Sequence, residues 1–435
     1  MAFEALATGT VMPVAATALG GVSSYGLAFG SFLATALVGI VAAGGWTDAR
    51  GPRGPVLAGL LLFAAGLLVA GAAGTFGLLL LGRAVSGLGG GMFSVALYVV
   101  IAAVYPQDLQ PRVFSVVSTA WVLPSIVGPV VAGWLATHVS WRAAFLGVLP
   151  FAVLLVPVLA TRLPAAPAQA PSPAATGSSS RGRLVRGVLL AGGALALQLG
   201  PEVRGVAGDA APYVVVPAGA LLVLAALPGL VPAGALRLRR GLPSLVAVRA
   251  LFTGTFAGAE AFVPLMLVAH RGITPALAGA VLTTGALGWT TGSWVQGSGR
   301  VRADHTTLLS LGGAVLGVGV ALLAVTPLGA VPVPLVPVAW ILGATGMGLG
   351  MSSMSVLTLR LSTPGEEGRN SSALQLGDAL GSLLGIGVAG ALFSAAHAEA
   401  AQATPYVLVW SVLAAAGFVG ALVARRVKPA RDGAA

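Results

Sequence analysis

Long apolar stretches follow one another along almost the whole of this 435-residue chain, and they decide the solvent in which it folds. Hydrophobic residues make up 57% of the sequence and charged residues only 8%, a balance that could not cover the surface of a water-soluble protein. A bilayer core of about 30 Å needs roughly 20 apolar residues for each helical crossing, so the chain has room for many crossings and little else. We therefore expect a protein embedded in a lipid bilayer.

The spanning segments are predicted to be α-helices. Backbone amides without a partner cost several kcal/mol each in lipid, so only helices and closed barrels cross a bilayer. The apolar stretches lack the two-residue alternation of barrel strands, which excludes the barrel. Gly, Pro and charged residues bound about fourteen spans. These are residues 2–19, 25–46, 55–73, 76–104, 113–136, 142–160, 186–200, 211–231, 244–268, 274–296, 306–326, 331–358, 370–396 and 404–424.

The spacing of the spans divides the chain into blocks of six, two and six. A stretch rich in Pro and Ser follows the sixth span and cannot bury a core, so it is predicted to be a linker. The predicted plan is an N-terminal six-helix bundle (1–160), a cytoplasmic linker (161–185), two additional central spans (186–243), a C-terminal six-helix bundle (244–424) and a cytoplasmic tail (425–435).

Positive charges lie almost entirely on one side of the predicted membrane. The loops after even-numbered spans and the tail hold most of the Arg and Lys residues, whereas the other side holds only Arg142, Arg204 and Arg271. The positive-inside rule therefore places both termini in the cytoplasm. This topology also explains the net charge of +11, so we do not expect nucleic acid as a partner.

The two six-span blocks share features at matching offsets. Arg112 precedes Gly128 by the same sixteen residues that separate Arg369 from Gly385. An acidic residue also lies in the first span of each block. Parallel halves related by an axis along the membrane normal, with a site at their interface, are typical of transporter folds.

A charged glycine turn follows the second span, Gly44-Gly-Trp-Thr-Asp48-Ala49-Arg50-Gly51-Pro52-Arg53. Its carboxylate and guanidinium groups can pair with each other or with a neighbouring helix end in one conformation only. The loop resembles the signature of the major facilitator superfamily between spans two and three, although Ala49 and Pro52 replace residues that are usually basic; an ordinary positive-inside loop is the alternative. The resemblance implies a conformational gate formed by Gly44, Asp48, Arg50, Gly51 and Arg53.

Arg83 lies inside the apolar fourth span. A charge there costs from about 2.5 kcal/mol upward, so it needs a partner or a wet cavity, or else it snorkels to the cytoplasmic interface. The segment is similar to the superfamily's R-x-x-Q-G-x-G element, which is associated with proton coupling. Ser86 stands where Gln is usual.

The fifth span resembles the G-x-x-x-G-P-x-x-G-G element of the antiporter branch through Gly128, Pro129 and Gly133, and the resemblance implies that these residues also take part in conformational gating. Generic close packing of small residues is the alternative. The segment from Trp141 to Phe145 resembles the W-R-x-x-F of fourteen-span drug:proton antiporters of the EmrB/QacA type, with an interfacial anchor as the alternative. The resemblance covers essentially the whole chain and implies the major facilitator fold, an all-α polytopic protein of two six-helix bundles with two extra central helices.

Three acidic residues fall inside predicted spans, namely Glu4, Glu260 and Asp378. A carboxyl group at low dielectric can take up and release a proton, and when ionised it attracts a cation. Glu4 resembles the acidic residue of the family's first-span element, while Gln375 precedes Asp378 by one turn and can share its face. The alternatives are a protonated acid bonded across a helix interface or, for Glu260, a pair with Arg249.

These residues lead to a prediction of proton-coupled transport. Glu4, Arg83, Glu260 and Asp378 are the predicted coupling residues. The predicted substrate-lining residues are Phe93, Tyr98, Trp121, Trp289, Trp340 and Gln375, although most aromatic residues in spans contact lipid or other helices. The resemblance implies export of small amphipathic or cationic drug-like compounds by alternating access of a midplane cavity. The proton gradient, a small-molecule substrate and the bilayer are then the only partners, and no cofactor is expected.

Two other functions stay open, namely export of an endogenous metabolite or lipid, and a non-transporting membrane scaffold or sensor. An enzyme is not expected because no nucleophile, base and orienting group cluster. Cysteine is absent and the four His residues lie far apart, so no metal site is predicted. A scaffold should tolerate neutralisation of the acids inside its spans.

Two further expectations concern the cell and the start of the chain. The Ala, Gly and Arg usage suggests a GC-rich bacterial genome, hence the plasma (inner) membrane; a monomer is expected, although the sequence does not fix the oligomeric state. Glu4 lies close to Met1, whereas the family's acidic element lies mid-helix. We therefore hypothesise that the first half of span one is missing, which a stop codon directly upstream of Met1 would disprove.

Overall fold

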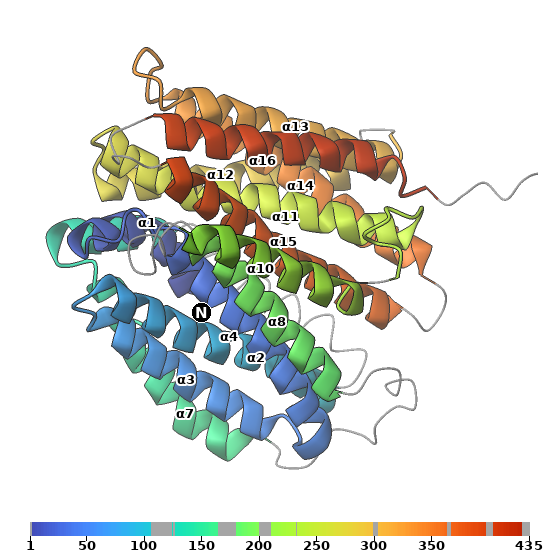
Figure 1. Ribbon diagram of the computed structural model, residues 1–435. Helices are drawn as coiled ribbons and strands as arrows, with labels where there is room; N and C mark the ends of the chain where they lie inside the picture. Colours follow the sequence, from blue (N-terminus) through green and yellow to red (C-terminus); the bar gives the residue numbers. More distant parts are fainter. Residues whose placement is uncertain are drawn as a thin grey trace, which may run out of the picture. The chain divides into compact units, whose positions relative to one another are not determined.

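All the regular structure in the described part of the chain is helical (Figure 1). The computed structural model describes residues 2–105, 124, 127–163, 180–199, 210–231, 233–298, 303–362, 367–396 and 403–428. Among these residues, nine helices are long and apolar enough to cross a membrane, and two shorter apolar helices cover Leu184–Leu199 and Tyr213–Ala226. The prediction of a helical multi-pass membrane protein is confirmed.

The chain forms two compact units, Met1–Ala226 with Thr274–Ala276, and Leu227–Ile273 with Leu277–Ala435. The first unit contains α1 (Ala2–Ala18), α2 (Leu27–Arg50), α3 (Arg53–Gly71), α4 (Phe76–Val104), the helical residues 127–138, α6 (Ala143–Leu146), α7 (Leu149–Arg162), α8 (Ser180–Leu199) and α10 (Ala211–Ala226). The second contains η2 (Leu227–Gly229), α11 (Leu242–Leu265), the π-helix η3 (Met266–His270), α12 (Pro275–Gly297), α13 (His305–Val325), α14 (Leu335–Leu361), α15 (Glu367–Ala396) and α16 (Thr404–Ala424).

The helices follow the predicted spans, with local differences at several helix ends. Within the predicted span 142–160, α6 ends at Leu146 and α7 begins at Leu149, with Pro150 in its first turn, although residues 143–162 together form one of the nine candidate spans. α8 begins at Ser180, within the predicted linker. Of the predicted span 113–136, only residue 124 and residues from 127 onward lie in the described part. The predicted domain boundaries stay predictions.

Glycine seams bring the helices of the first unit together. On α4, Gly87 and Gly91 face the backbone carbonyls of Phe32 and Ala36 in α2, and a methyl group at either glycine would overlap them. On the opposite side of α4, Gly89 fits against the backbone of Phe63 in α3 in the same way. Small residues allow such close approach of helices in membranes. α4 is therefore held between α2 and α3 with backbone against backbone.

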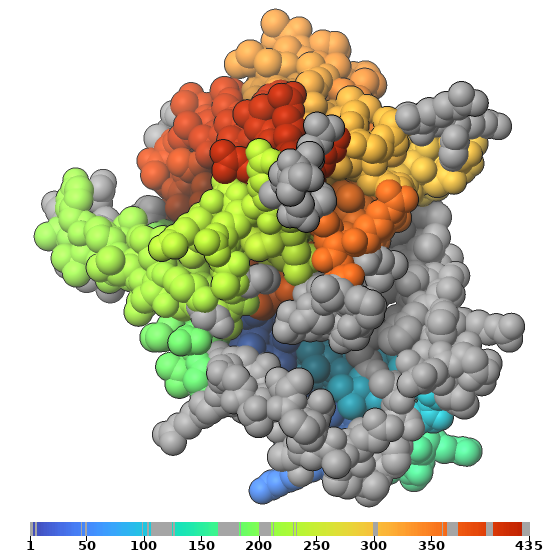
Figure 2. Space-filling view, turned by 90° about the vertical axis from the view of Figure 1, so that its right-hand side faces the viewer, coloured from blue at the N-terminus to red at the C-terminus, as the bar shows by residue number. Residues whose placement is uncertain are grey.

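The second unit repeats this kind of contact. Gly254 and Gly258 of α11 face Gly381 and Gly385 of α15, where an added Cβ would lie 2.8 and 2.9 Å from the carbonyl oxygens of the two α15 glycines. α13 and α16 also meet at glycines, with Gly317 against Gly417, and they lie side by side in both the ribbon and the space-filling view (Figures 1 and 2). Each unit is thus built around closely packed helix pairs.

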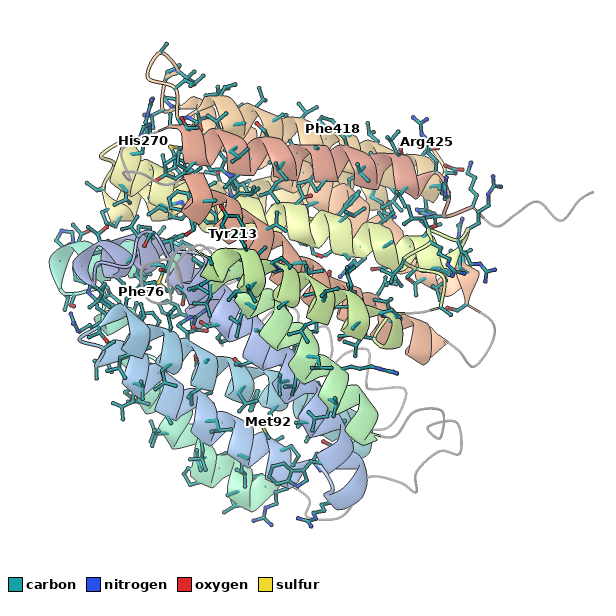
Figure 3. All side chains as sticks on the ribbon, viewed as in Figure 1. Phe76, Met92, Tyr213, His270, Phe418 and Arg425 are labelled. Atoms are coloured by element: carbon teal, nitrogen blue, oxygen red, sulfur yellow. The ribbon has the colours of Figure 1, made fainter. Side chains whose placement is uncertain are left out.

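Large apolar side chains also cover the outside of the helices. Phe151 on α7 is 70% exposed and Tyr213 on α10 is 76% exposed; Tyr213 and the exposed Phe418 of α16 are labelled in Figure 3. In water such a surface would be unfavourable, whereas in a bilayer it contacts acyl chains at no hydrophobic cost.

Candidate functional site

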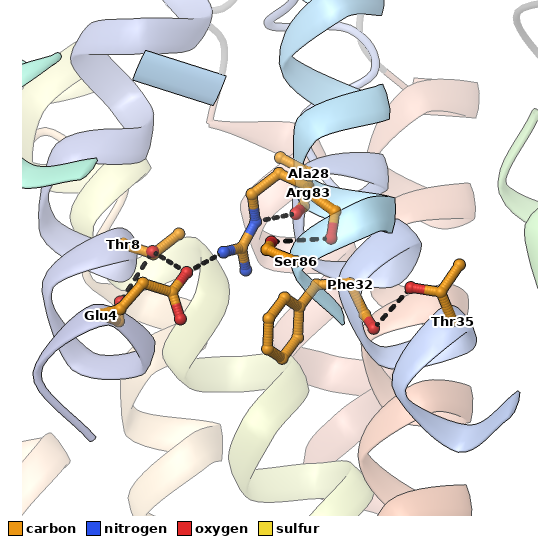
Figure 4. A network of polar contacts seen from close by, with 7 residues as sticks. All are labelled: Glu4, Thr8, Ala28, Phe32, Thr35, Arg83 and Ser86. Carbon is orange, nitrogen blue, oxygen red and sulfur yellow. Dashed lines mark hydrogen bonds and ion pairs between the residues drawn. The ribbon is translucent and has the colours of Figure 1, made fainter. Parts of the chain in front are cut away.

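A buried ion pair joins α1 to α4 in the first unit (Figure 4). The Nη1 group of Arg83 contacts Oε1 of Glu4, and the two residues are only 3% and 1% exposed. The Thr8 hydroxyl lies 3.1 Å from the same carboxylate oxygen and 2.7 Å from the Glu4 backbone carbonyl oxygen, so its single proton is shared between these two acceptors. Because Arg83 is buried and paired, the snorkelling alternative is wrong.

The α2 helix supplies the other contacts of the Arg83 side chain. Its Nε donates to the carbonyl of Ala28 at 3.0 Å, and its guanidinium carbon lies 4.4 Å from the centre of the Phe32 ring, a cation–π contact. Thr35, one turn further along α2, donates to the carbonyl of Ala84 at 2.6 Å. The Ser86 hydroxyl bonds the Arg83 carbonyl at 3.0 Å. One short segment of α2 thus fixes the position of Arg83.

The second oxygen of Glu4 has a different environment. Oε2 is buried and has no hydrogen-bond partner among the described residues. Leaving such an atom without a partner costs about 1–3 kcal/mol, more when the group is charged. The pair therefore leaves one polar atom of the carboxylate unsatisfied within the described part of the chain.

The second unit contains another ion pair, between α11 and α15. Arg249 contacts Asp378 with two groups, Nε to Oδ1 at 2.5 Å and Nη2 to Oδ2. The side chains are 15% and 28% exposed. The alternative that Arg249 pairs with Glu260 is therefore wrong. Gln375, which was predicted to share the face of Asp378, is exposed and forms no hydrogen bond within the described part of the chain.

Glu260 lies beside an aromatic cluster in the second unit. It is half-buried and has no ion-pair or hydrogen-bond partner in the described residues. Phe256, one turn earlier on α11, stacks on Trp340 with ring centres 4.7 Å apart and meets Trp289 edge-on at 5.7 Å. The Trp340 indole donates to the Leu282 carbonyl at 3.2 Å. Phe256 thus joins the two tryptophans near an available carboxylate.

Phe256 was not among the predicted lining residues, whereas its neighbours Trp289 and Trp340 were. The four-residue spacing from Glu260 could have identified Phe256, because residues at that spacing share a helix face. Phe93 packs against the core cluster of Val56, Ala96 and Val100 in the first unit. The side chain of Tyr98 and all of Trp121 lie outside the described residues.

The predicted gate loop joins α2 to α3. Gly51 ends α2 with a φ of 80°, a conformation that favours glycine, and its N–H donates to the Thr47 carbonyl at 2.9 Å. Arg53 donates to the carbonyl of Ala160 in α7 at 2.6 Å. Arg50 is exposed.

The remaining gate predictions are only partly described. A Cβ at Gly44 would meet nothing within 4 Å. The side chain of Asp48 lies outside the described part, whereas Gly128, Pro129 and Gly133 are buried in the helical residues 127–138. The gating role of these residues stays a prediction.

Comparison with known families decides the class of the protein. The family model of the Major Facilitator Superfamily matches residues 1–336. The chain belongs to this superfamily. Its members are membrane transporters and not enzymes, as predicted.

Individual relatives are distant. A probable multidrug-efflux transporter of Mycobacterium tuberculosis is 26% identical over 394 residues, which cover 85% of this chain and 80% of the relative. Vacuolar basic amino acid transporter 5 of Saccharomyces cerevisiae is 31% identical over 156 residues, which cover 36% of this chain and 27% of that protein. This chain matches only 27% of the length of that yeast transporter, and only 22% of the length of an uncharacterized MFS-type transporter of Mycobacterium tuberculosis.

Solved structures agree with the fold. A POT family transporter in complex with 5-aminolevulinic acid aligns with a TM-score of 0.71 at 13% identity, over 98% of this chain and 95% of that chain. At this identity, the likeness to this superfamily structure supports the fold and not the substrate.

Proposed function

We propose that this superfamily member is a proton-coupled secondary transporter that exports small amphipathic or cationic compounds across the plasma membrane by alternating access. The observation that carries the proposal is the Glu4–Arg83 pair, sealed from solvent and with one carboxylate oxygen unpartnered. A buried ion pair is a poor way to stabilise a scaffold, because apolar residues of similar size are often as stable. A transporter has a use for it, because protonation changes the charge of the pair.

The proposed cycle follows from this change. With Glu4 ionised, its ion pair with Arg83 holds α1 against α4, while Thr8 contacts the carboxylate from within α1. A proton that reaches Glu4 neutralises it and weakens its attraction to Arg83, which allows the helices to rearrange. One charge moving through 100 mV supplies about 2.3 kcal/mol. At about 1.4 kcal/mol per decade, this supports roughly fortyfold accumulation of substrate.

The aromatic cluster supports the cationic class of substrate. An ammonium or similar cation is attracted by a carboxylate such as that of Glu260 and by aromatic faces, the latter by about 0.5–2 kcal/mol. Phe256 and Trp289 are half-buried and therefore partly accessible, whereas Trp340 is buried and its ring stacks on that of Phe256. The name of the Mycobacterium tuberculosis relative, a probable multidrug-efflux transporter, supports the export of drug-like compounds.

The test is efflux of a fluorescent organic cation from energised vesicles, with and without a protonophore. We expect Glu4→Gln to lower the rate at least about tenfold, the equivalent of about 1.4 kcal/mol. Glu260→Gln should mainly raise the substrate concentration needed for half-maximal efflux. Asp304→Asn, at an exposed helix cap, is the matched control and should behave as the parent.

Parent-like, protonophore-sensitive efflux by Glu4→Gln would refute coupling through this pair. If no organic cation is exported while an endogenous metabolite or lipid is, the superfamily assignment stands and the proposed substrate class fails.

A further inference from the structure

The helix α8 carries a buried side-chain amide that belongs to neither of the ion pairs nor to the aromatic cluster. Gln198 is 2% exposed, and it is the one polar residue other than Arg186 between Leu184 and Leu199. Its Nε2 donates only a long bond of 3.4 Å to the Ala194 carbonyl of its own helix. Its Oε1 is buried with no partner in the described residues.

The amide rests directly on the backbone of α2. A Cβ added to Gly30 would lie 2.7 Å from the amide carbon of Gln198 and closer still to its nitrogen and oxygen. No residue larger than glycine leaves room for the amide in this position. The neighbouring hydroxyl of Ser31 is also buried and without a partner in the described part of the molecule. The amide and the glycine are therefore fitted to each other.

The same turn of α2 holds Arg83. The carbonyl that accepts from Arg83 Nε belongs to Ala28, two residues before Gly30. The ring that covers the guanidinium belongs to Phe32, two residues after it. A shift of the α2 backbone at Gly30 would therefore move both contacts of Arg83 at once.

Packing alone does not explain an amide at this place. A buried polar atom without a partner costs about 1–3 kcal/mol, whereas an apolar side chain of similar volume carries no such cost. The flanking residues Leu197 and Leu199 are both apolar. Polar residues inside membrane spans are costly and typically functional.

We propose that Gln198 is a positioning residue for the Glu4–Arg83 pair. Its amide, seated on Gly30, fixes the turn of α2 that holds Arg83, and through Arg83 it sets the proton affinity of Glu4. α8, one of the two helices added to the two blocks of six, then takes part in proton coupling. The link to transport rests on the proposed function, whereas the effect on proton binding does not.

The test measures proton binding without any substrate. In the purified full-length protein, the infrared carboxyl signal of Glu4, identified by its loss in Glu4→Gln, is followed over a pH series. Gln198→Met keeps the volume and removes the amide, and we expect the midpoint to move upward by about one pH unit, a tenfold change in proton affinity. The reason is that a displaced Arg83 favours the ionised carboxylate less. Gln296→Leu removes an amide in the second unit that contacts His305 at 3.3 Å and should leave the midpoint unchanged.

A second pair of variants tests the fit itself. Gly30→Ala should expel the amide and move the midpoint as Gln198→Met does. In Gln198→Ala/Gly30→Ala the new methyl group occupies the vacated space, so the shift should be smaller than the sum of the single shifts. Strictly additive shifts, or a Gln198→Met midpoint within about 0.3 pH unit of the parent, a twofold change, would overturn the proposal.

The two proposals fail in different ways. A shifted Glu4 midpoint in a protein that exports no cation supports the positioning role and refutes the transport proposal. Proton-driven export that responds to Glu4→Gln, together with an unchanged Glu4 midpoint in Gln198→Met, supports the transport proposal and refutes the positioning role of Gln198.

Discussion

Replacing Asp378 by Asn should destabilise the second unit, because it leaves the guanidinium of Arg249 without its charged partner. The pair has two contacts and is mostly buried, with exposures of 15% and 28%. Two unit charges about 4 Å apart attract each other by about 4 kcal/mol at an effective dielectric of 20, and breaking a fully buried pair costs about 3–5 kcal/mol. Partial exposure reduces both figures, so we expect a loss of about 2–3 kcal/mol.

The assay is thermal unfolding of the purified protein, in which this loss corresponds to a fall in Tm of roughly 5–10 °C for a unit of about 200 residues. The double variant Arg249→Met/Asp378→Leu replaces both charges by apolar groups and should recover most of the stability. A coupling energy below about 0.5 kcal/mol between the two positions would refute this reasoning.

The same variants separate two roles of Asp378. Both of its carboxylate oxygens contact Arg249, an arrangement that favours a structural link between α11 and α15. If the link is structural, the stable double variant should still export substrate. If Asp378 carries a coupling proton, as the sequence analysis predicted, the double variant should be stable and inactive.

Three further predictions concern packing, pH and topology. Gly385→Val should prevent α15 from approaching α11 and lower Tm by several degrees, whereas Gly329→Ala, where a Cβ meets nothing within 4 Å, should not; equal Tm values would refute the seam. Hydrogen bonds from Lys428, the largest cause, and from Thr307 lower the pKa of the Asp304 carboxyl from 3.8 to about 2. The stabilising contribution of this carboxylate is therefore present above about pH 4 and is lost as the pH falls through 2. Asp304→Asn should remove this acid-range contribution in a Tm–pH series, and an unchanged series would contradict the assignment. In this cysteine-free chain, an impermeant thiol reagent should label Ala330→Cys in intact cells and Lys428→Cys only after permeabilisation; the reverse would invert the predicted topology.

The helices were predictable because span length depends on bilayer thickness, a constraint that the apolar runs display directly. The turn at Gly147 and the start of α8 at Ser180 could not be predicted from the sequence, because helix ends depend on local turns and tertiary contacts.

The charged residues were predictable one by one, and their partners were not. Arg83 and Glu4 were both singled out, yet they are separated by 79 positions. Arg249 was considered with an acid on its own helix, while its partner lies 129 positions away. Helical periodicity identifies neighbours within one helix but not which helices are adjacent. Gln198 could have been noticed by the rule applied to the acids, because a polar residue in a span needs an explanation.

The glycine seams have a consequence for motion. Where Gly254 of α11 meets Gly385 of α15, the atoms nearest to each glycine across the interface are backbone atoms. Where large side chains interdigitate, they must separate before one helix can slide along another. A contact of backbone against backbone presents a lower energy barrier to such a small shear motion. The contacts that hold these helices closest together are thus also those along which they can shift with the lowest barrier.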